Sequence, residues 1–369
     1  MVLALVAVAV QALPVSLLLS ARSSAWGSLR FRALLAGIFI ALPIYGEIGA
    51  IMTCAQWFLA LSAFLLVVAS KSRSLVGQLL DLSILTLCGL TGPFCIVLMP
   101  IAIFLAWRRG GPRPGLSVVA LTAPSVVQVG ALLMKDPNVR FYPVLGASPA
   151  FFLNLIASKV YIGTLLGRNA LAIQPGFWAS IFLLVAFVGG TAILVACFLK
   201  ASCEMKLFIL SANLLLAASI FSPMAGVRAG YSTWQVLAFM DASRYWFFPM
   251  LAFAWAILWC IQSRLPFARA VSVILLCVMC FGIVREWRQP VLRGMHFADD
   301  AKRFEAAPAG TTITIPEGTP GWNLLRSNAS RAYRPRGLSP LSSLRTPDSI
   351  VMPHWTANRE EFRAFSEYT

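Results

Sequence analysis

A stretch near the middle of the chain, residues 222–249, combines side chains that could recognise a phosphorylated ligand. It carries Arg228, Asp241, Arg244 and Tyr245 between two long apolar runs. An arginine guanidinium binds phosphate or carboxylate through two parallel hydrogen bonds. A tyrosine ring beside it can contact a sugar, or it can anchor the chain at a membrane surface. We therefore expect Arg228 and Arg244 to bind an anionic ligand.

The apolar part of the chain is poor in carboxylates, so those that remain are candidates for chemistry. Its acidic residues are Glu47, Asp81, Asp136, Glu204 and Asp241. We interpret Glu204 as a solvated partner of nearby lysines and Asp136 as part of a turn. Glu47 and Asp241 each lie at the outer end of a predicted span. Either could act as a general base or hold a divalent cation that binds a phosphate. The alternative is that each pairs with a nearby arginine.

Histidine chemistry is excluded from the apolar part, because the histidines of the chain are His296 and His354, both near its end. Cys277 and Cys280 form a CxxC motif inside an apolar run, without histidine or carboxylate neighbours. We expect them to be a buried structural pair. The sequence therefore predicts no metal site built from protein ligands alone.

Composition predicts a membrane protein. Hydrophobic residues make up 59% of the chain and the mean hydropathy is +0.79. The net charge is +16, but the basic residues stand in small groups between apolar runs. This spacing favours contact with an anionic membrane face and argues against the single basic face of a nucleic-acid-binding protein. We predict an all-α polytopic membrane protein of about ten membrane-crossing or hairpin helices, with the lipid bilayer as its partner.

The longest apolar run, residues 77–107, exceeds one straight span. Gly92 and Pro93 stand in its middle, and we predict a hairpin of two short helices that turns at Thr91–Pro93. The positive-inside rule then places these basic residues in the cytoplasm: Arg22, Arg30, Arg32, Lys71, Arg73, Arg108, Arg109, Arg113, Lys200, Lys206, Arg264 and Arg269. Glu47 and residues 222–244 fall on the outer face. Residues 152–166 could re-enter the membrane, lie in its interface or span it.

The composition changes at Arg285. We predict a transmembrane helical domain over residues 1–284 and a polar tail over residues 285–369. The alternation in Thr311–Ile315 predicts a strand, so the tail is expected to be a small, partly ordered domain on the periplasmic surface. At the same, outer boundary of the membrane, we expect Trp246, Phe247 and Phe248 to belong to an interfacial aromatic belt.

Several short motifs resemble a known group of proteins. They are Glu47 with the segment Met52-Thr53-Cys54-Ala55-Gln56-Trp57-Phe58-Leu59-Ala60-Leu61, the segment Gly89-Leu90-Thr91-Gly92-Pro93-Phe94, the segment Arg244-Tyr245-Trp246-Phe247-Phe248-Pro249, and Ile315-Pro316 with Pro320-Gly321-Trp322. They look like motifs of uncharacterised bacterial multi-pass inner-membrane proteins. That group in turn resembles the GT-C superfamily of polyprenyl-phosphate-sugar-dependent glycosyltransferases.

The resemblance implies a polyprenyl-phosphate sugar as donor, an active site on the outer face and an acidic base in the first outer loop. The chain departs from the family pattern at two places. Its early acid is the single Glu47, which follows the second apolar run; this would fit a chain that lacks an N-terminal portion. Cys54 stands where the pattern has asparagine.

The leading hypothesis is a GT-C-like protein of the bacterial inner membrane that handles a lipid-linked sugar in cell-envelope glycan assembly. Glu47 would be the general base, with Asp241 as a second carboxylate. Arg228 and Arg244 would bind the lipid phosphate, and Tyr245, Gln56 and Trp57 would line the sugar site. The alternatives are a non-catalytic membrane scaffold or degenerate family member, and a lipid or glycan transporter.

Overall fold

The computed structural model describes residues 2–42, 54–109, 114–134, 144–167, 177–221, 232–239, 243–288, 297–308, 312–316 and 323–327. The chain divides into two compact units, residues 1–288 and residues 289–369. All the long apolar helices belong to the first unit. The predicted all-α polytopic class agrees with this architecture.

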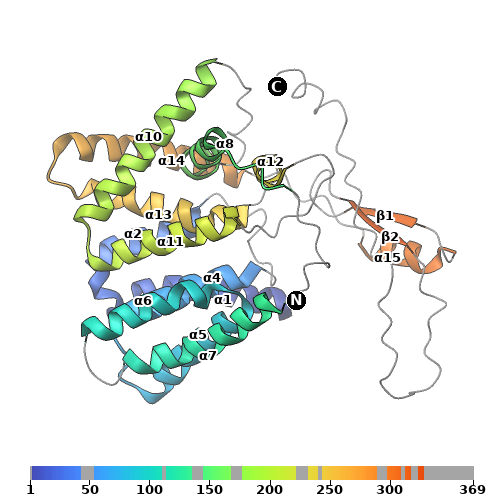
Figure 1. The fold of residues 1–369 in the computed structure, drawn as a ribbon, viewed down its shortest axis with the longest axis horizontal. Helices are drawn as coiled ribbons and strands as arrows, with labels where there is room; N and C mark the ends of the chain where they lie inside the picture. Colours follow the sequence, from blue (N-terminus) through green and yellow to red (C-terminus); the bar gives the residue numbers. More distant parts are fainter. Residues whose placement is uncertain are drawn as a thin grey trace. The chain divides into compact units, whose positions relative to one another are not determined.

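The first unit begins with a group of helices that pack on one another: α1 Val2–Leu19, η1 Ala21–Trp26, α2 Leu29–Ala41, α4 Ala55–Val68, α5 Leu75–Thr91, α6 Phe94–Arg109 and α7 Pro114–Leu133. A second group follows: α8 Pro149–Leu155, the π-helix η4 Ile156–Ile162, α9 Gly163–Leu166, α10 Phe177–Lys200, α11 Cys203–Phe221, α12 Thr233–Phe239, α13 Ser243–Ile261 and α14 Pro266–Trp287. Figure 1 shows α1, α4, α5, α6, α7, α11 and α13 lying side by side.

Seven segments of the described chain are long and apolar enough to cross a membrane: Val2–Leu19, Gly115–Leu133, Pro149–Leu166, Ala179–Lys200, Cys203–Phe221, Arg244–Ile261 and Pro266–Trp287. Ala55–Val68 and Leu75–Thr91 are shorter apolar helices. Most of the long helices bury little of their surface inside the protein; Ala179–Lys200 buries 11% of its most apolar window. An apolar helix that leaves so much surface uncovered requires lipid around it.

Helix α13 is the centre of the first unit, because 83% of its apolar window is buried. It packs against α2, α10, α11 and α14. The Trp255 indole donates to the carbonyl of Leu35 at 3.1 Å. Trp26 packs edge-on against Trp255, Phe64 and Phe208, so η1, α4, α11 and α13 meet in one aromatic cluster. The cluster ties the two helix groups together.

Two sequence-based expectations fail in this part of the chain. Trp246, Phe247 and Phe248 are all buried, with at most 2% of each exposed. They belong to the core around α13, and the prediction of an interfacial belt is wrong for them. Cys277 and Cys280 are both exposed on α14, so the expectation of a buried pair is also wrong. The sequence alone does not show whether an aromatic or thiol side chain in an apolar helix faces lipid or the protein core.

The predicted hairpin is confirmed. Helix α5 ends at Thr91, and α6 begins at Phe94. Arg109, at the end of α6, donates to the carbonyls of Val67, Val68 and Ala69 at the end of α4. Since α5 starts six residues after Ala69, both open ends of the hairpin lie at the same end of the helix bundle.

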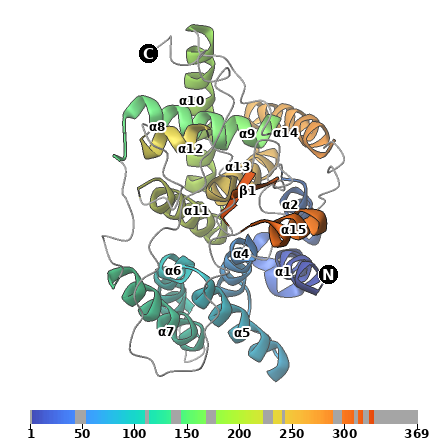
Figure 2. The ribbon, with the colours of Figure 1, turned by 90° about the vertical axis from the view of Figure 1, so that its right-hand side faces the viewer.

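Residues 149–166 run crosswise to the main bundle. Figure 1 shows α8 along its axis, whereas Figure 2, turned by 90°, shows α8 and α9 from the side and α1 end-on. From the sequence, residues 152–166 could re-enter the membrane, lie in its interface or span it. The crosswise direction argues against a span that runs parallel to the other helices. The core of this segment is buried against α10, α13 and α14, and it contains the π-helix Ile156–Ile162. Single π-turns inside helices are frequently found at functional sites.

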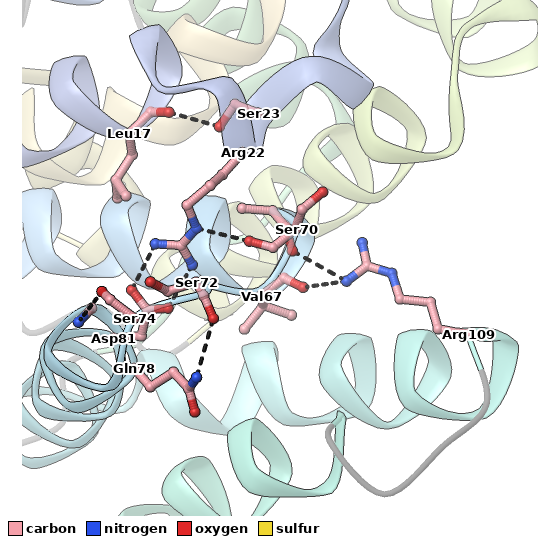
Figure 3. A network of polar contacts seen from close by, with 12 residues as sticks. Leu17, Arg22, Ser23, Val67, Ser70, Ser72, Ser74, Gln78, Asp81 and Arg109 are labelled. Carbon is pink, nitrogen blue, oxygen red and sulfur yellow. Dashed lines mark hydrogen bonds and ion pairs between the residues drawn. The ribbon is translucent and has the colours of Figure 1, made fainter.

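One end of the bundle, which we call the basic end, holds most of the cytoplasmic arginines and lysines expected from the charge rule. Arg32 is buried, with 7% exposed, and donates to the carbonyls of Leu18 and Ser20 at the end of α1. Arg22 donates to the carbonyl of Ser70 at 2.8 Å and forms an ion pair with Asp81 (Figure 3). The last carbonyls of a helix have no partner within it, and they carry its negative dipole end. These arginines therefore fix helix ends.

The second unit contains helix α15 Phe297–Ala306 and the strands β1 Thr312–Pro316 and β2 Asn323–Ser327. The strands pair antiparallel, with Thr314 opposite Leu325. The strand that the alternation in Thr311–Ile315 predicts is therefore present as β1.

Candidate substrate site at the aromatic end

A second end of the bundle lies opposite the basic end; we call it the aromatic end. Helix α4 has 14 residues, or about 21 Å at 1.5 Å per residue, and it separates Trp57 near its start from Val67 near its end. The turn between α5 and α6 and the start of α13 meet the start of α4 there. Gln56, Trp57, Arg244 and Tyr245 of the sequence-based site are therefore at the same end.

Trp57 is the centre of the aromatic end. Its ring lies 4.9 Å from that of Phe94 and 6.3 Å from those of Tyr245 and Phe248, measured between centroids. Phe94 and Phe248 also contact one another at 6.4 Å. The cluster thus joins residues from α4, α6 and α13 that are far apart in sequence. Its edge-to-face contacts hold the rings in fixed orientations.

Polar atoms are buried within this apolar cluster without a partner. The indole nitrogens of Trp57 and Trp246 and the hydroxyl of Tyr245 make no hydrogen bond to any described residue. Leaving such a donor buried and unpaired costs about 1–3 kcal/mol. Tyrosine and tryptophan usually satisfy their polar atom when buried. The orphaned groups of Trp57 and Tyr245, whose rings are in contact, therefore mark a place suited to a polar ligand.

Arg244 adds positive charge to the cluster. Its guanidinium carbon lies 5.1 Å from the centre of the Tyr245 ring. A guanidinium stacked on an aromatic face keeps its in-plane N–H groups directed outward. An anionic group at this position could receive hydrogen bonds from Arg244 and from the Tyr245 hydroxyl.

Gln56 reaches the hairpin turn. A Cβ atom placed on Gly92 would lie 2.8 Å from the Gln56 Oε1 atom and 2.9 Å from the Phe94 ring. Glycine at this position therefore lets the turn approach the start of α4 closely.

Glu286 is a buried carboxylate that sequence reasoning missed. It has 7% exposure and lies in the last turn of α14. Its Oε2 atom would lie 2.8 Å from a Cβ atom on Gly167, the residue that ends α9 with a φ of +79°. The neighbouring Trp287 indole donates to the carbonyl of Ala41 at the end of α2. The missed signal was an acid directly after an apolar run, in residues assigned to the tail.

Three residues of the sequence-based site, Glu47, Arg228 and Asp241, lie outside the described residues. The end of α2 and the start of α4, which flank Glu47 in sequence, both lie at the aromatic end. Within the described part of the chain, no group of three histidine, cysteine or acidic side chains could hold a metal ion. The bundle thus brings together four of the seven candidates.

Comparisons with models of protein families, with curated protein sequences and with solved structures find no match to this chain.

Proposed function

We propose that this protein is a GT-C-like membrane glycosyltransferase that binds a polyprenyl-phosphate sugar at the aromatic end and transfers the sugar to an envelope glycan. The observation that supports this most directly is the pair of orphaned donors on Trp57 and Tyr245, whose rings are in contact, with Arg244 over the Tyr245 ring. Buried aromatic rings with free donors suit a sugar, and a guanidinium suits its phosphate.

The donor would be held by its two chemical halves. Arg244, together with Arg228, would bind the phosphate, and the Tyr245 hydroxyl would donate to it. The rings of Trp57 and Tyr245 would contact the sugar ring, and Gln56 would bind the sugar hydroxyls. The polyprenyl chain would lie along the exposed apolar faces of the helices, in the lipid. These contacts would orient the bond between the anomeric carbon and the phosphate oxygen toward the outer face.

In the transfer step, an acceptor hydroxyl attacks the anomeric carbon and the bond from that carbon to the phosphate oxygen breaks. The lipid phosphate leaves with both bond electrons, and the arginines stabilise its charge. Glu47 takes the acceptor proton as general base. Asp241 would assist, either as a second carboxylate or by holding a divalent cation against the phosphate. The bacterial inner membrane is the proposed location, with the aromatic end and the tail on the periplasmic side and about ten crossings.

The test is the pool of lipid-linked sugars in a strain from which the gene is deleted, measured by mass spectrometry. We expect one polyprenyl-phosphate sugar to accumulate and to return to its usual level when the wild-type chain is supplied. Glu47→Gln should fail to clear it although the protein is present in the membrane at wild-type amounts. Glu204→Gln, at the basic end, is the matched control and should clear it.

An unchanged pool would contradict the transferase and favour a scaffold or transporter. Clearance by Glu47→Gln would leave the transferase in place but remove Glu47 as its base.

A further inference from the structure

The corner of the basic end where α4, α5 and α6 meet presents three cations that the helix caps do not use. Lys71, Arg73 and Arg108 are all exposed. The described acid at this corner, Asp81, is already paired with Arg22. The corner therefore has positive charge in excess of what its own contacts neutralise. We call these three residues the basic corner.

The loop that carries two of these cations is held by a network of hydrogen bonds, part of which Figure 3 shows. The Ser70 amide donates to the Arg22 carbonyl at 2.9 Å, and the Ser70 carbonyl accepts from the Arg22 side chain. The Ser72 carbonyl accepts from the Gln78 amide at 3.2 Å. Ser74 caps α5 by accepting from the Gly77 amide. In the segment Ser70-Lys71-Ser72-Arg73-Ser74, the three serines form hydrogen bonds within the protein, and the two cations between them are exposed.

The helix end that carries the third cation is held next to this loop by Arg109. That residue holds the end of α6 against the carbonyls of Val67, Val68 and Ala69, directly before the serine loop. Arg108 precedes it in the chain and stays exposed. A binding group whose cations are already positioned loses less conformational entropy when a ligand arrives.

The corner also marks a boundary between apolar and basic surface on two separate helices. On α5, Leu75 and Val76 are 72% and 77% exposed and follow Arg73. On α6, Trp107 is 81% exposed and precedes Arg108. Exposed tryptophan next to basic residues is typical of the headgroup region of a membrane. The start of α5 and the end of α6, which run in opposite directions, thus indicate the same level for the membrane surface.

We propose that the basic corner binds the phosphate of an anionic phospholipid headgroup, with Trp107 seated beside it at the membrane surface. The phosphate would lie between Lys71, Arg73 and Arg108, and the acyl chains would follow the exposed apolar faces of α5 and α6. This lipid site is at the opposite end of the bundle from the proposed sugar site and does not depend on it.

The test is lipid retention by the purified full chain in native mass spectrometry. Detergent-solubilised protein is offered equal amounts of phosphatidylglycerol and phosphatidylcholine with the same acyl chains. We expect wild type to retain phosphatidylglycerol preferentially. In Lys71→Gln/Arg73→Gln/Arg108→Gln the preference should fall roughly fivefold for each cation that contacts the phosphate. Arg73→Gln alone provides a milder variant if the triple variant does not fold.

The matched control is Arg30→Gln/Arg264→Gln/Arg269→Gln, which removes three exposed cations outside the corner. It should keep the wild-type preference. An equal loss in the control would show a general effect of net charge and overturn the site, as would wild type without a preference. Inorganic phosphate that displaces the phospholipid completely would point to a free anion as the ligand and would also overturn the proposal.

Discussion

At the scale of single residues, removing the Tyr245 hydroxyl tests whether it stabilises the fold or binds a ligand. It is buried and makes no hydrogen bond to a described residue. Tyr245→Phe therefore removes no internal hydrogen bond, and we expect the free energy of unfolding to stay the same or to rise slightly. Donor binding should weaken by about tenfold, because a hydrogen bond to a charged phosphate contributes roughly 1.5 kcal/mol. The measurement pairs thermal unfolding in detergent with titration of a polyprenyl-phosphate sugar.

Tyr161→Phe is the control for that variant. Its hydroxyl is within hydrogen-bond distance of the Thr191 hydroxyl at 3.0 Å. Loss of this bond should lower the unfolding free energy by about 1 kcal/mol and leave donor binding unchanged. If Tyr245→Phe behaved in the same way, its hydroxyl would have a structural partner and no ligand.

Gly167 is a residue whose backbone requires glycine. It ends α9 in the left-handed region, with Glu286 directly beside it. Gly167→Ala would place a Cβ atom at positive φ and against a buried carboxylate, so we expect a loss of about 1–3 kcal/mol. Gly189→Ala in α10 meets open space and should be neutral or raise stability by up to about 1 kcal/mol. Thermal unfolding of the two variants makes the comparison; equal effects would contradict the argument.

At the scale of elements, Arg109 joins the end of one helix to the end of another. Arg109→Ala leaves the carbonyls of Val67, Val68 and Ala69 without this donor. We expect a loss of about 1–3 kcal/mol, with Arg109→Lys intermediate because lysine lacks the planar fork. Arg264→Ala, exposed at the same end, should change stability by less than about 0.5 kcal/mol. Unfolding in a neutral detergent measures the stability of all three variants. Equal losses for Arg109→Ala and Arg264→Ala would show that Arg109 acts only as a surface charge and not as a helix cap.

The sequence predicted where helices begin and end better than it predicted which residues they pack against. The break at Gly92-Pro93 was readable because proline removes a backbone donor wherever it stands. The fate of Phe247 and Phe248 was not, because the same aromatic run at the start of a span fits a belt or a core. Contacts with Phe39 and Trp57 decide it, and those depend on how α2 and α4 pack. Glu286 escaped notice because a charge after an apolar run usually marks solvent, whereas here the crosswise segment covers it.

At the scale of the whole molecule, the two ends differ in charge and in chemistry. The basic end presents exposed Lys71, Arg73 and Arg264, and the aromatic end holds rings with free donors. This asymmetry predicts a fixed orientation across the membrane, with the basic end in the cytoplasm.

Single cysteines test that orientation. In a Cys203→Ser/Cys277→Ser/Cys280→Ser background, where the remaining native cysteines are buried, Arg73→Cys and Arg264→Cys should react with a membrane-impermeant maleimide only after the cells are permeabilised. Arg288→Cys, at the end of α14 opposite Arg264 and Arg269, should react in intact cells. The reverse pattern would place the proposed sugar site in the cytoplasm and exclude a periplasmic acceptor.

The contact between Arg109 and the end of α4 also has a consequence for biosynthesis. The carbonyls of Val67 and Val68 leave the ribosome about forty residues before Arg109, their side-chain donor. Helix α4 therefore stays incompletely capped until the α5–α6 pair has been inserted and has turned back on it. A nascent chain halted before Arg109 would expose an unsatisfied helix end to the insertion machinery. The smallest stable intermediate of membrane insertion is thus expected to contain α1 to α6 rather than any single helix pair.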